Sequence, residues 1–175
     1  MIRTLASQPR FTWGMVLILG WCAQGCGGIT PLWKGDCQEL AKSKTLYYQQ
    51  PCEYAISSQD LSEPGPYALE LTLTYYIQIG RSELPLYLNI EDAKHDIQEF
   101  YFTIPLKKDG RDLGHLAQNE IDLTITHLAI PRLELPEESY TLRVFYDGER
   151  LMEEEAKGII ALEARLFQAA EYISN

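Results

Sequence analysis

The sequence is poor in positive charge and in cysteine, and each shortage excludes a class of protein. Its 15 lysines and arginines stand against 25 aspartates and glutamates, which gives a formal net charge of −10. Because nucleic-acid binding depends on basic contacts to phosphates, we expect no nucleic acid among the partners. Four cysteines are too few for a disulfide-built miniprotein, and they lack the paired spacing of a structural zinc site. A hydrophobic content of 46% predicts a globular domain with a real core.

Motifs for catalysis and cofactor binding are also missing. The sequence has no G-x-S-x-G nucleophile element and no glycine-rich loop for phosphate or dinucleotide binding. Asp92, His95 and Asp96 keep a metal-dependent hydrolase open as a lesser hypothesis. Their spacing matches no metal motif of fixed geometry, however, and a polar loop between strands is the favoured interpretation. The sequence therefore predicts a protein that is not an enzyme, with no catalytic residue, no metal and no cofactor.

The longest apolar run stands at the N-terminus. Residues 11–25 are uncharged and follow Arg3 and Arg10, which is typical of a secretory signal peptide over residues 1–25. A membrane-spanning helix would need about 20 consecutive apolar residues, more than this run supplies. Ala23-Gln24-Gly25 fits ordinary cleavage, but the same residues followed by Cys26 resemble a bacterial lipoprotein box. We therefore predict cleavage before Cys26 and a lipid on its sulfur.

Cysteine counting supports lipidation. After cleavage, Cys26, Cys37 and Cys52 remain, an odd number that would leave one thiol over in an oxidising compartment. A lipid on Cys26 leaves two, and both a disulfide between Cys37 and Cys52 and a pair of free thiols stay open. We assign residues 26–44 to a lipid-anchored tether. By resemblance to bacterial lipoproteins, Gly27 in place of aspartate implies the outer membrane, with the domain facing the periplasm.

The body of the chain, residues 45–175, alternates apolar and polar residues with a period of two. This pattern predicts several short strands and an all-β fold, an antiparallel β-sandwich of the immunoglobulin or jelly-roll kind, with a closed barrel as the alternative. Residues 67–79 and 84–90 are predicted to form a hairpin or neighbouring strands. Asp147-Gly148 predicts a tight hairpin turn. Residues 158–166 suit a final strand or, with the tail, a short C-terminal helix. The predicted inward residues include Leu69, Leu71, Leu73, Tyr75, Ile77, Ile79, Leu84, Leu86, Leu88, Ile90, Ile121, Leu123, Ile125, His127, Tyr140, Leu142, Val144 and Tyr146.

Tyrosine is unusually frequent, with 11 residues against 5 phenylalanines. Tyr76, Tyr87 and Tyr101 fall opposite the inward leucines, so an exposed sheet face carrying them is a candidate contact surface for a protein or a glycan. Burial of these rings beneath the second sheet is the competing interpretation.

Several short motifs resemble the gliding-motility lipoprotein H family of the Bacteroidetes. The order of features runs from a lipoprotein signal through YALELTLTYYIQIGRSELPLYLNI and DGRDLG to SYTLRVFYDGERL and KGIIALEARL. The matching positions are Arg81, Gly110-Arg111, Leu113-Gly114, Tyr140 and Gly158-Ile159, whereas Asp112 stands where the family has tryptophan. The resemblance implies a non-catalytic cell-envelope lipoprotein that binds other envelope proteins and supports gliding motility or type IX secretion. The alternative is a secreted or surface glycan-binding β-sandwich.

Overall fold

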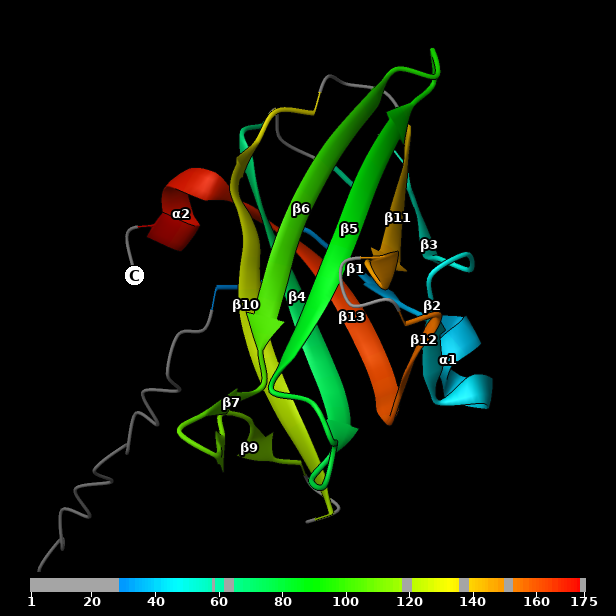
Figure 1. Cartoon of the computed structure of the whole chain (residues 1–175). Helices are drawn as coiled ribbons and strands as arrows, with labels where there is room; N and C mark the ends of the chain where they lie inside the picture. The colour runs from blue at the N-terminus through cyan, green and yellow to red at the C-terminus, as the bar shows by residue number, and fades with distance from the viewer. Residues whose placement is uncertain are drawn as a thin grey trace, which may run out of the picture.

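The protein folds as two stacked antiparallel β-sheets (Figure 1). The computed structural model describes residues 29–57, 59–61, 65–117, 121–135, 139–149 and 153–173. The predicted signal peptide and Cys26 lie outside these residues. Within the described part, neither helix is long and apolar enough to cross a membrane.

The first sheet has five strands in the order β1-β13-β4-β10-β9. Their bounds are Trp33–Asp36, Ile159–Gln168, Tyr67–Tyr76, Asp122–Leu133 and His115–Leu116. The second sheet has four strands in the order β3-β11-β5-β6, with bounds Cys52–Ile56, Tyr140–Tyr146, Glu83–Asp92 and Ile97–Pro105. Two small ribbons pair β12 (Glu155–Lys157) with β2 (Thr45–Tyr47), and β7 (Lys107–Lys108) with β8 (Arg111–Asp112). Helix α1 spans Gln38–Ser43 and α2 spans Ala169–Ile173.

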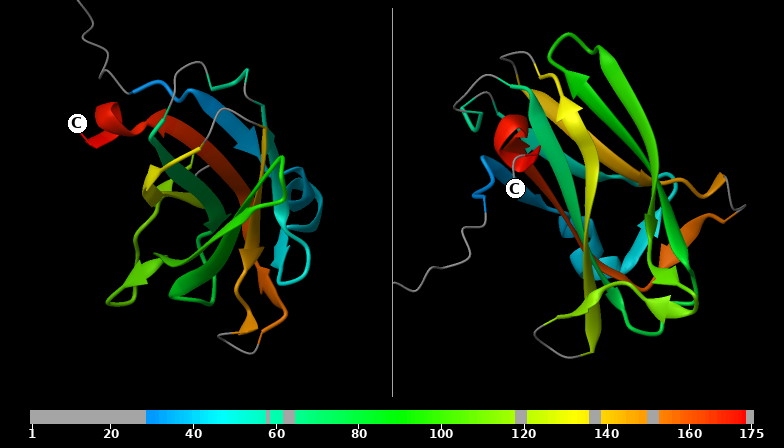
Figure 2. Two further views of the ribbon diagram at one scale, coloured as in Figure 1. Left: turned by 90° about the horizontal axis from the view of Figure 1, so that it is seen from above. Right: turned by 90° about the vertical axis from the view of Figure 1, so that its left-hand side faces the viewer.

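The core lies between the two sheets, and the period-two pattern explains how it forms. Alternate residues of a strand point to opposite faces, so one apolar set per strand is enough to fill the sandwich. Every second residue of β11, from Tyr140 to Tyr146, is buried, and Leu84, Leu86 and Leu88 of β5 are fully buried. The predicted antiparallel β-sandwich is therefore confirmed. Two turned views show its layers (Figure 2).

The connection between β4 and β5 differs from the prediction. Tyr67–Tyr76 belongs to the five-stranded sheet, whereas Glu83–Asp92 belongs to the four-stranded sheet. The intervening residues 77–82 pass from one sheet to the other instead of closing a hairpin. Ile77 lies in this crossing segment and is 42% exposed, so its predicted inward position is wrong. Ile79 is buried as predicted.

In β10 the predicted inward set is only partly buried. Leu123 is buried, but Ile121 lies before the strand and is 63% exposed, and Ile125 and His127 are half-buried. The ring of His127 stacks on Phe102 with centroids 5.7 Å apart. Partial burial lowers the pKa of His127, which favours its neutral form.

The tight hairpin turn occurs at the other Asp-Gly pair of the chain. Asp109 and Gly110 have φ values of 52° and 75° and join β7 to β8. Positive φ at both central residues is the requirement of a type I′ turn. Gly148 has no positive φ, and β11 continues into a loop whose first amide, that of Asp147, donates to the Pro85 carbonyl oxygen (3.1 Å). The hairpin predicted at residues 147–148 is therefore wrong.

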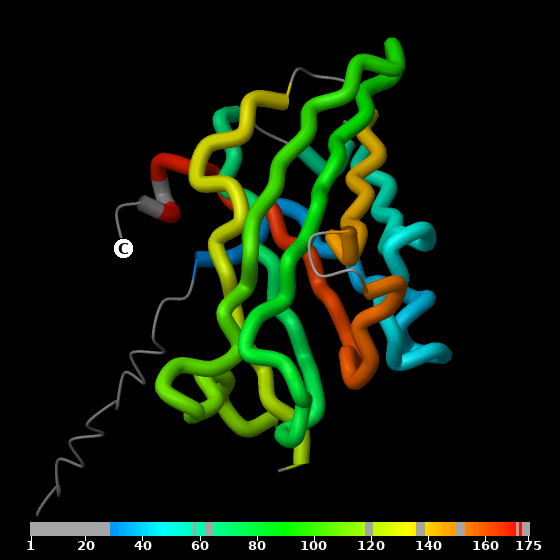
Figure 3. The backbone as a smooth tube through the Cα atoms, in the orientation of Figure 1, coloured from blue at the N-terminus to red at the C-terminus, as the bar shows by residue number. Residues whose placement is uncertain are grey.

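The folded body begins before Thr45. Residues 33–36, which we assigned to the tether, form β1 and pair with β13. In Figure 3, β1 is blue and β13 is orange-red. Helix α1 follows, with Leu40 buried in the core. The sequence of β1 is Trp-Lys-Gly-Asp, which has too few apolar residues to show an alternating pattern.

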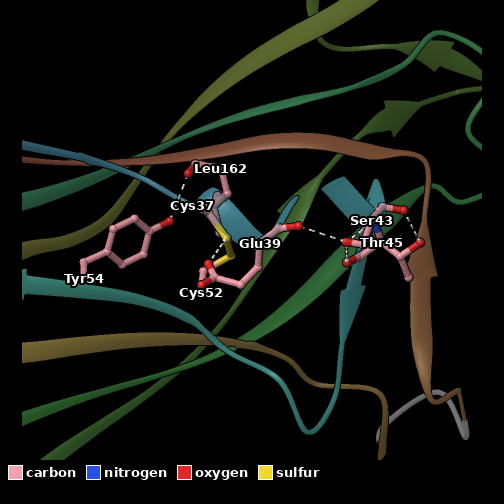
Figure 4. The surroundings of a disulfide bond; sticks show 7 residues. All are labelled: Cys37, Glu39, Ser43, Thr45, Cys52, Tyr54 and Leu162. Carbon is pink, nitrogen blue, oxygen red and sulfur yellow. Dashed lines mark hydrogen bonds between the residues drawn. A yellow bond between two sulfur atoms is a disulfide. The ribbon is translucent and has the colours of Figure 1, made fainter. Parts of the chain in front are cut away.

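A disulfide closes this N-terminal part of the domain. Cys37 and Cys52 are bonded, with a Cα–Cα distance of 5.2 Å, which decides between the two open alternatives in favour of pairing. The bond joins the start of α1 to the first residue of β3 (Figure 4). Beside it, the hydroxyl of Tyr54 donates to the carbonyl oxygen of Leu162 (2.9 Å), linking the two sheets. Burial is the main cause of the raised pKa of Tyr54, so this phenol stays protonated.

The C-terminal segment contains both elements that the sequence left open. Strand β13 ends at Gln168, and the short helix α2 follows directly. The Tyr172 hydroxyl donates to Glu70 Oε2 (2.7 Å), and Arg165 Nη1 lies 3.5 Å from Glu70 Oε1. Glu70 is a nearly buried carboxylate on the outer face of β4, so these contacts give it the partners that its burial requires.

Candidate functional site

An aromatic row crosses the outer face of the four-stranded sheet. It consists of Tyr101 on β6, Tyr87 on β5 and Phe145 on β11, which are direct cross-strand neighbours. Tyr87 points outward because Leu86 and Leu88 on either side fill the core. The Tyr87 and Tyr101 rings stack with centroids 4.8 Å apart, and Tyr87 lies 5.3 Å from Phe145. Such contacts hold the three rings in a fixed arrangement.

Tyr101 is the open end of the aromatic row. Its side chain is 68% exposed, and β6 is the last strand of its sheet, so no neighbouring strand covers the far face of the ring. Tyr87 is held from both sides, and its hydroxyl donates to Glu99 Oε1 (2.6 Å). Burial and this hydrogen bond raise the pKa of Tyr87 to about 12. One face of the Tyr101 ring is therefore exposed, and its other face stacks on the fixed ring of Tyr87.

A charged row runs parallel to the aromatic row on the same sheet face. At its centre Arg143 of β11 donates from Nε to Glu53 Oε2 (2.8 Å) and from Nη1 to Glu91 Oε2 (2.5 Å). The guanidinium is the main reason that the pKa of Glu91 is lowered, so this carboxylate is ionised at neutral pH. The three side chains come from β3, β11 and β5, and their pairing keeps this part of the face polar and ordered.

A cleft of about 440 Å³ adjoins the sheet at the end where β11 leaves it. One wall is formed by residues 47–50, which comprise the end of β2 and the segment after it. The other wall is formed by Gly148, Glu149, Glu153 and Glu154. The walls are joined by the Tyr48 amide, which donates to the Glu154 carbonyl oxygen (3.0 Å), and by the Tyr48 hydroxyl, which donates to the Glu149 carboxylate. This second bond raises the pKa of Tyr48, and Tyr101 is close enough to contribute to the shift. The cleft begins at Gly148, three residues after Phe145, the end of the aromatic row on β11.

A polar cluster fixes the second wall. The hydroxyl of Tyr146 donates to Glu153 Oε2 (2.6 Å), and Arg81 donates to both groups, at 2.9 Å to the hydroxyl and 3.1 Å to the carboxylate. The Tyr146 hydrogen bond is the main cause of the lowered pKa of Glu153. Arg81 comes from the segment that crosses between the sheets, so this crossing positions the cleft.

The predicted binding residues separate into two places. Tyr87 and Tyr101 lie together in the aromatic row, where the alternation of β5 and β6 predicted an outward face. Tyr76 ends β4 in the five-stranded sheet, opposite Asp122, and is 45% exposed there. Two further residues, Phe145 and Tyr48, were not predicted. The outward position of Phe145 could have been predicted, because its neighbours Val144 and Tyr146 point inward. No alternating pattern around Tyr48 would have shown its position.

The residues of the metal hypothesis build a turn. Asp92 Oδ1 accepts hydrogen bonds from the Lys94 amide (2.8 Å) and the Asp96 amide (2.9 Å), which closes the loop between β5 and β6. His95 adopts a positive φ of 67° in this loop, and its Nδ1 lies 2.5 Å from Glu91 Oε1. This hydrogen bond raises the pKa of His95. Among the described residues, no three histidine, cysteine or acidic side chains gather in a group fit to hold a metal ion.

Comparison with known proteins finds a distant likeness in structure but none in sequence. No protein-family model matches the chain, and no curated protein matches its sequence. Among solved structures, it is similar to the C-terminal family 22 carbohydrate-binding module of Clostridium thermocellum Xyn10B, with 10% sequence identity and a TM-score of 0.32. The match covers 69% of this chain and 64% of that chain, less than two thirds of its length. The resemblance to gliding-motility lipoproteins stays a prediction.

Proposed function

We propose that this domain is a non-catalytic glycan-binding module, and that the aromatic row and the adjoining cleft form its binding site. The observation that carries the proposal is the Tyr101 ring, 68% exposed on a sheet face and stacked on the fixed ring of Tyr87. A large exposed aromatic ring is costly to leave in water, and its flat face suits the apolar C–H face of a sugar ring.

The cleft supplies the polar half of such a site. Sugars carry many hydroxyl groups, which need both donors and acceptors in a binding site. The exposed side chains of Gln49 and Gln50 provide amide donors and acceptors, and Glu149 provides carboxylate oxygens. Because the walls are already joined through Tyr48, little ordering is needed when a ligand binds. Small-molecule sites usually combine apolar and aromatic contacts with a few placed polar groups, which the aromatic row and the cleft would supply together.

Replacing Tyr101 with alanine tests this proposal. A sugar stacked on one face of the ring buries part of this side chain, and we take the resulting contribution to binding as about 1.5 kcal/mol. Without the ring, the affinity for the best-binding glycan should therefore fall about tenfold. The measurement is a glycan array followed by titration calorimetry. Tyr76→Ala is the matched control, because Tyr76 is also an exposed tyrosine at a strand but lies on the other sheet.

Equal affinities for wild type and Tyr101→Ala, or an equal loss in Tyr76→Ala, would contradict the proposed site. The role expected from the family resemblance, a protein-binding accessory of gliding motility and type IX secretion, stays a prediction. Tyr101-dependent glycan binding would favour the carbohydrate function over it.

We further propose that the domain is exported to the cell envelope and anchored through a lipid on Cys26. The Cys37–Cys52 disulfide supports export, because such bonds persist in oxidising compartments and are rare in the cytosol. Replacing Cys26 with serine is expected to move the protein from the membrane fraction to the soluble fraction and to abolish labelling by a palmitate analogue. Cys22→Ser, a change within the same predicted signal segment, should leave both unchanged. Lipidation would be disproved if the Cys26→Ser protein stayed in the membrane fraction and the wild type took up no palmitate label.

A further inference from the structure

Acidic side chains surround the candidate glycan site. Glu149, Glu153 and Glu154 line the cleft, and no basic side chain lines it among the described residues. The complete segment 147–155 contains five acidic residues and one arginine, Arg150, which lies outside the described residues. On the sheet face, Glu99 adjoins the aromatic row. The site therefore lies in a negative electrostatic potential.

Two arginines beside the site are already paired. Arg143 binds both Glu53 and Glu91, and its side chain is only 26% exposed. Arg81 binds Glu153 and the Tyr146 hydroxyl, and its side chain is 18% exposed. The carboxylates beside them hold these guanidinium groups, so an anionic ligand would have to displace an intramolecular partner before either arginine contacted it.

We propose that the ligand is an uncharged glycan, and that uronate-containing, sulfated and phosphorylated glycans are rejected. This inference rests on the proposed function and narrows its substrate class. Neutral sugar hydroxyls donate hydrogen bonds to carboxylate oxygens, so the acidic walls serve a neutral ligand as acceptors. A carboxylate or sulfate of the ligand that lies about 5 Å from one wall carboxylate would instead be repelled. This repulsion would lower the affinity of the ligand about fourfold, even at the dielectric constant of water.

The test uses the full exported domain and oligosaccharides of equal length. Cellohexaose, xylohexaose, mannohexaose and chitohexaose form the neutral set, and hexamers of galacturonate, of mannuronate and of heparin form the anionic set. Titration calorimetry is repeated for each with wild type and Tyr101→Ala. We expect the tightest binder to be neutral, with at least tenfold higher affinity than any anionic hexamer and with loss of binding in Tyr101→Ala.

Ionic strength provides an independent readout. Raising the salt from about 0.01 M to about 0.15 M shortens the Debye length from about 30 Å to about 8 Å. Neutral binding should change little, whereas any residual anionic binding should strengthen as repulsion is screened. An anionic hexamer that binds most tightly, weakens with salt and depends on Tyr101 would overturn the inference while leaving glycan binding intact. If no hexamer of either set binds, the proposed function itself fails.

Discussion

Replacing Cys37 and Cys52 together with alanine is expected to lower the free energy of unfolding by about 3 kcal/mol. The two cysteines are separated by 15 residues, and a cross-link closing a loop of that length removes about this much conformational entropy from the unfolded chain. Both sulfurs are also buried, so alanine leaves a small cavity in place of the bond. For a domain of this size the melting temperature should fall by about 10 °C, measured by calorimetry or denaturant unfolding.

The same double change should weaken glycan binding. The closed loop, residues 38–51, contains residues 47–50, which form one wall of the cleft. Without the bond this wall samples more conformations, and ordering it on binding costs free energy. We expect about a tenfold loss of affinity. Reducing the wild-type protein with a thiol reagent should reproduce both losses and should leave the double variant unaffected. A wild type whose stability and affinity do not respond to complete reduction would contradict this role.

The second large effect is expected for Gly148→Ala. A Cβ atom at this position would lie 1.8 Å from the carbonyl oxygen of Glu153, a backbone atom that cannot rotate away. The backbone must move, which breaks the hydrogen bond from the Glu153 amide to the Gly148 carbonyl oxygen (2.9 Å) and disturbs the contacts of Glu153 with Arg81. Overpacking of this kind typically costs about 1–3 kcal/mol, and we expect the upper end because backbone meets backbone.

Gly80→Ala is the matched control for this change. A Cβ atom at Gly80 would have no atom within 4 Å, so its stability should stay within about 0.5 kcal/mol of wild type. Thermal unfolding measures the stability difference, and titration calorimetry should show weaker glycan binding for Gly148→Ala because its cleft wall is displaced. If both glycine variants unfold at the wild-type temperature, the close packing at Gly148 does not support the cleft.

The strands themselves were predictable, but their partners were not. The inward residues predicted from the alternation in 84–90 and 140–146 are all buried in β5 and β11, because the residues that fill the core recur at every second position. Pro85, which belongs to the alternate set, is buried as well. The same pattern says nothing about which sheet a strand joins. β4 and β5 are neighbours in sequence with a turn-forming segment between them, yet they lie in opposite sheets.

Turn chemistry shows the same limit. Asp109-Gly110 and Asp147-Gly148 are identical dipeptides, but only the first forms the tight hairpin turn. At the second, the Asp147 amide donates to the Pro85 carbonyl oxygen of another strand, and the Glu153 amide donates to the Gly148 carbonyl oxygen. Contacts between distant parts of the chain therefore override the local preference for a hairpin.

Of the candidate site, the aromatic row could be predicted from the sequence and the cleft could not. Outward positions on β5 and β6 predicted Tyr87 and Tyr101, because strand periodicity alone determines the face on which they lie. The cleft depends on Tyr48 meeting Glu149, and these residues are 101 positions apart. Neither segment has a motif that would show the contact. The wall residues thus come together only through the packing of β2, β11 and the crossing segment at Arg81.

The disulfide also determines how the domain would transmit a mechanical load. A pull between an anchored N-terminus and a glycan held at Tyr101 would enter through the four residues of β1 and reach Cys37 next. From there the covalent bond carries tension directly to Cys52 and into β3 of the sheet that bears the aromatic row. Residues 38–51 lie outside this force path. The cleft wall would therefore keep its shape under tension, even if β1 were peeled from β13.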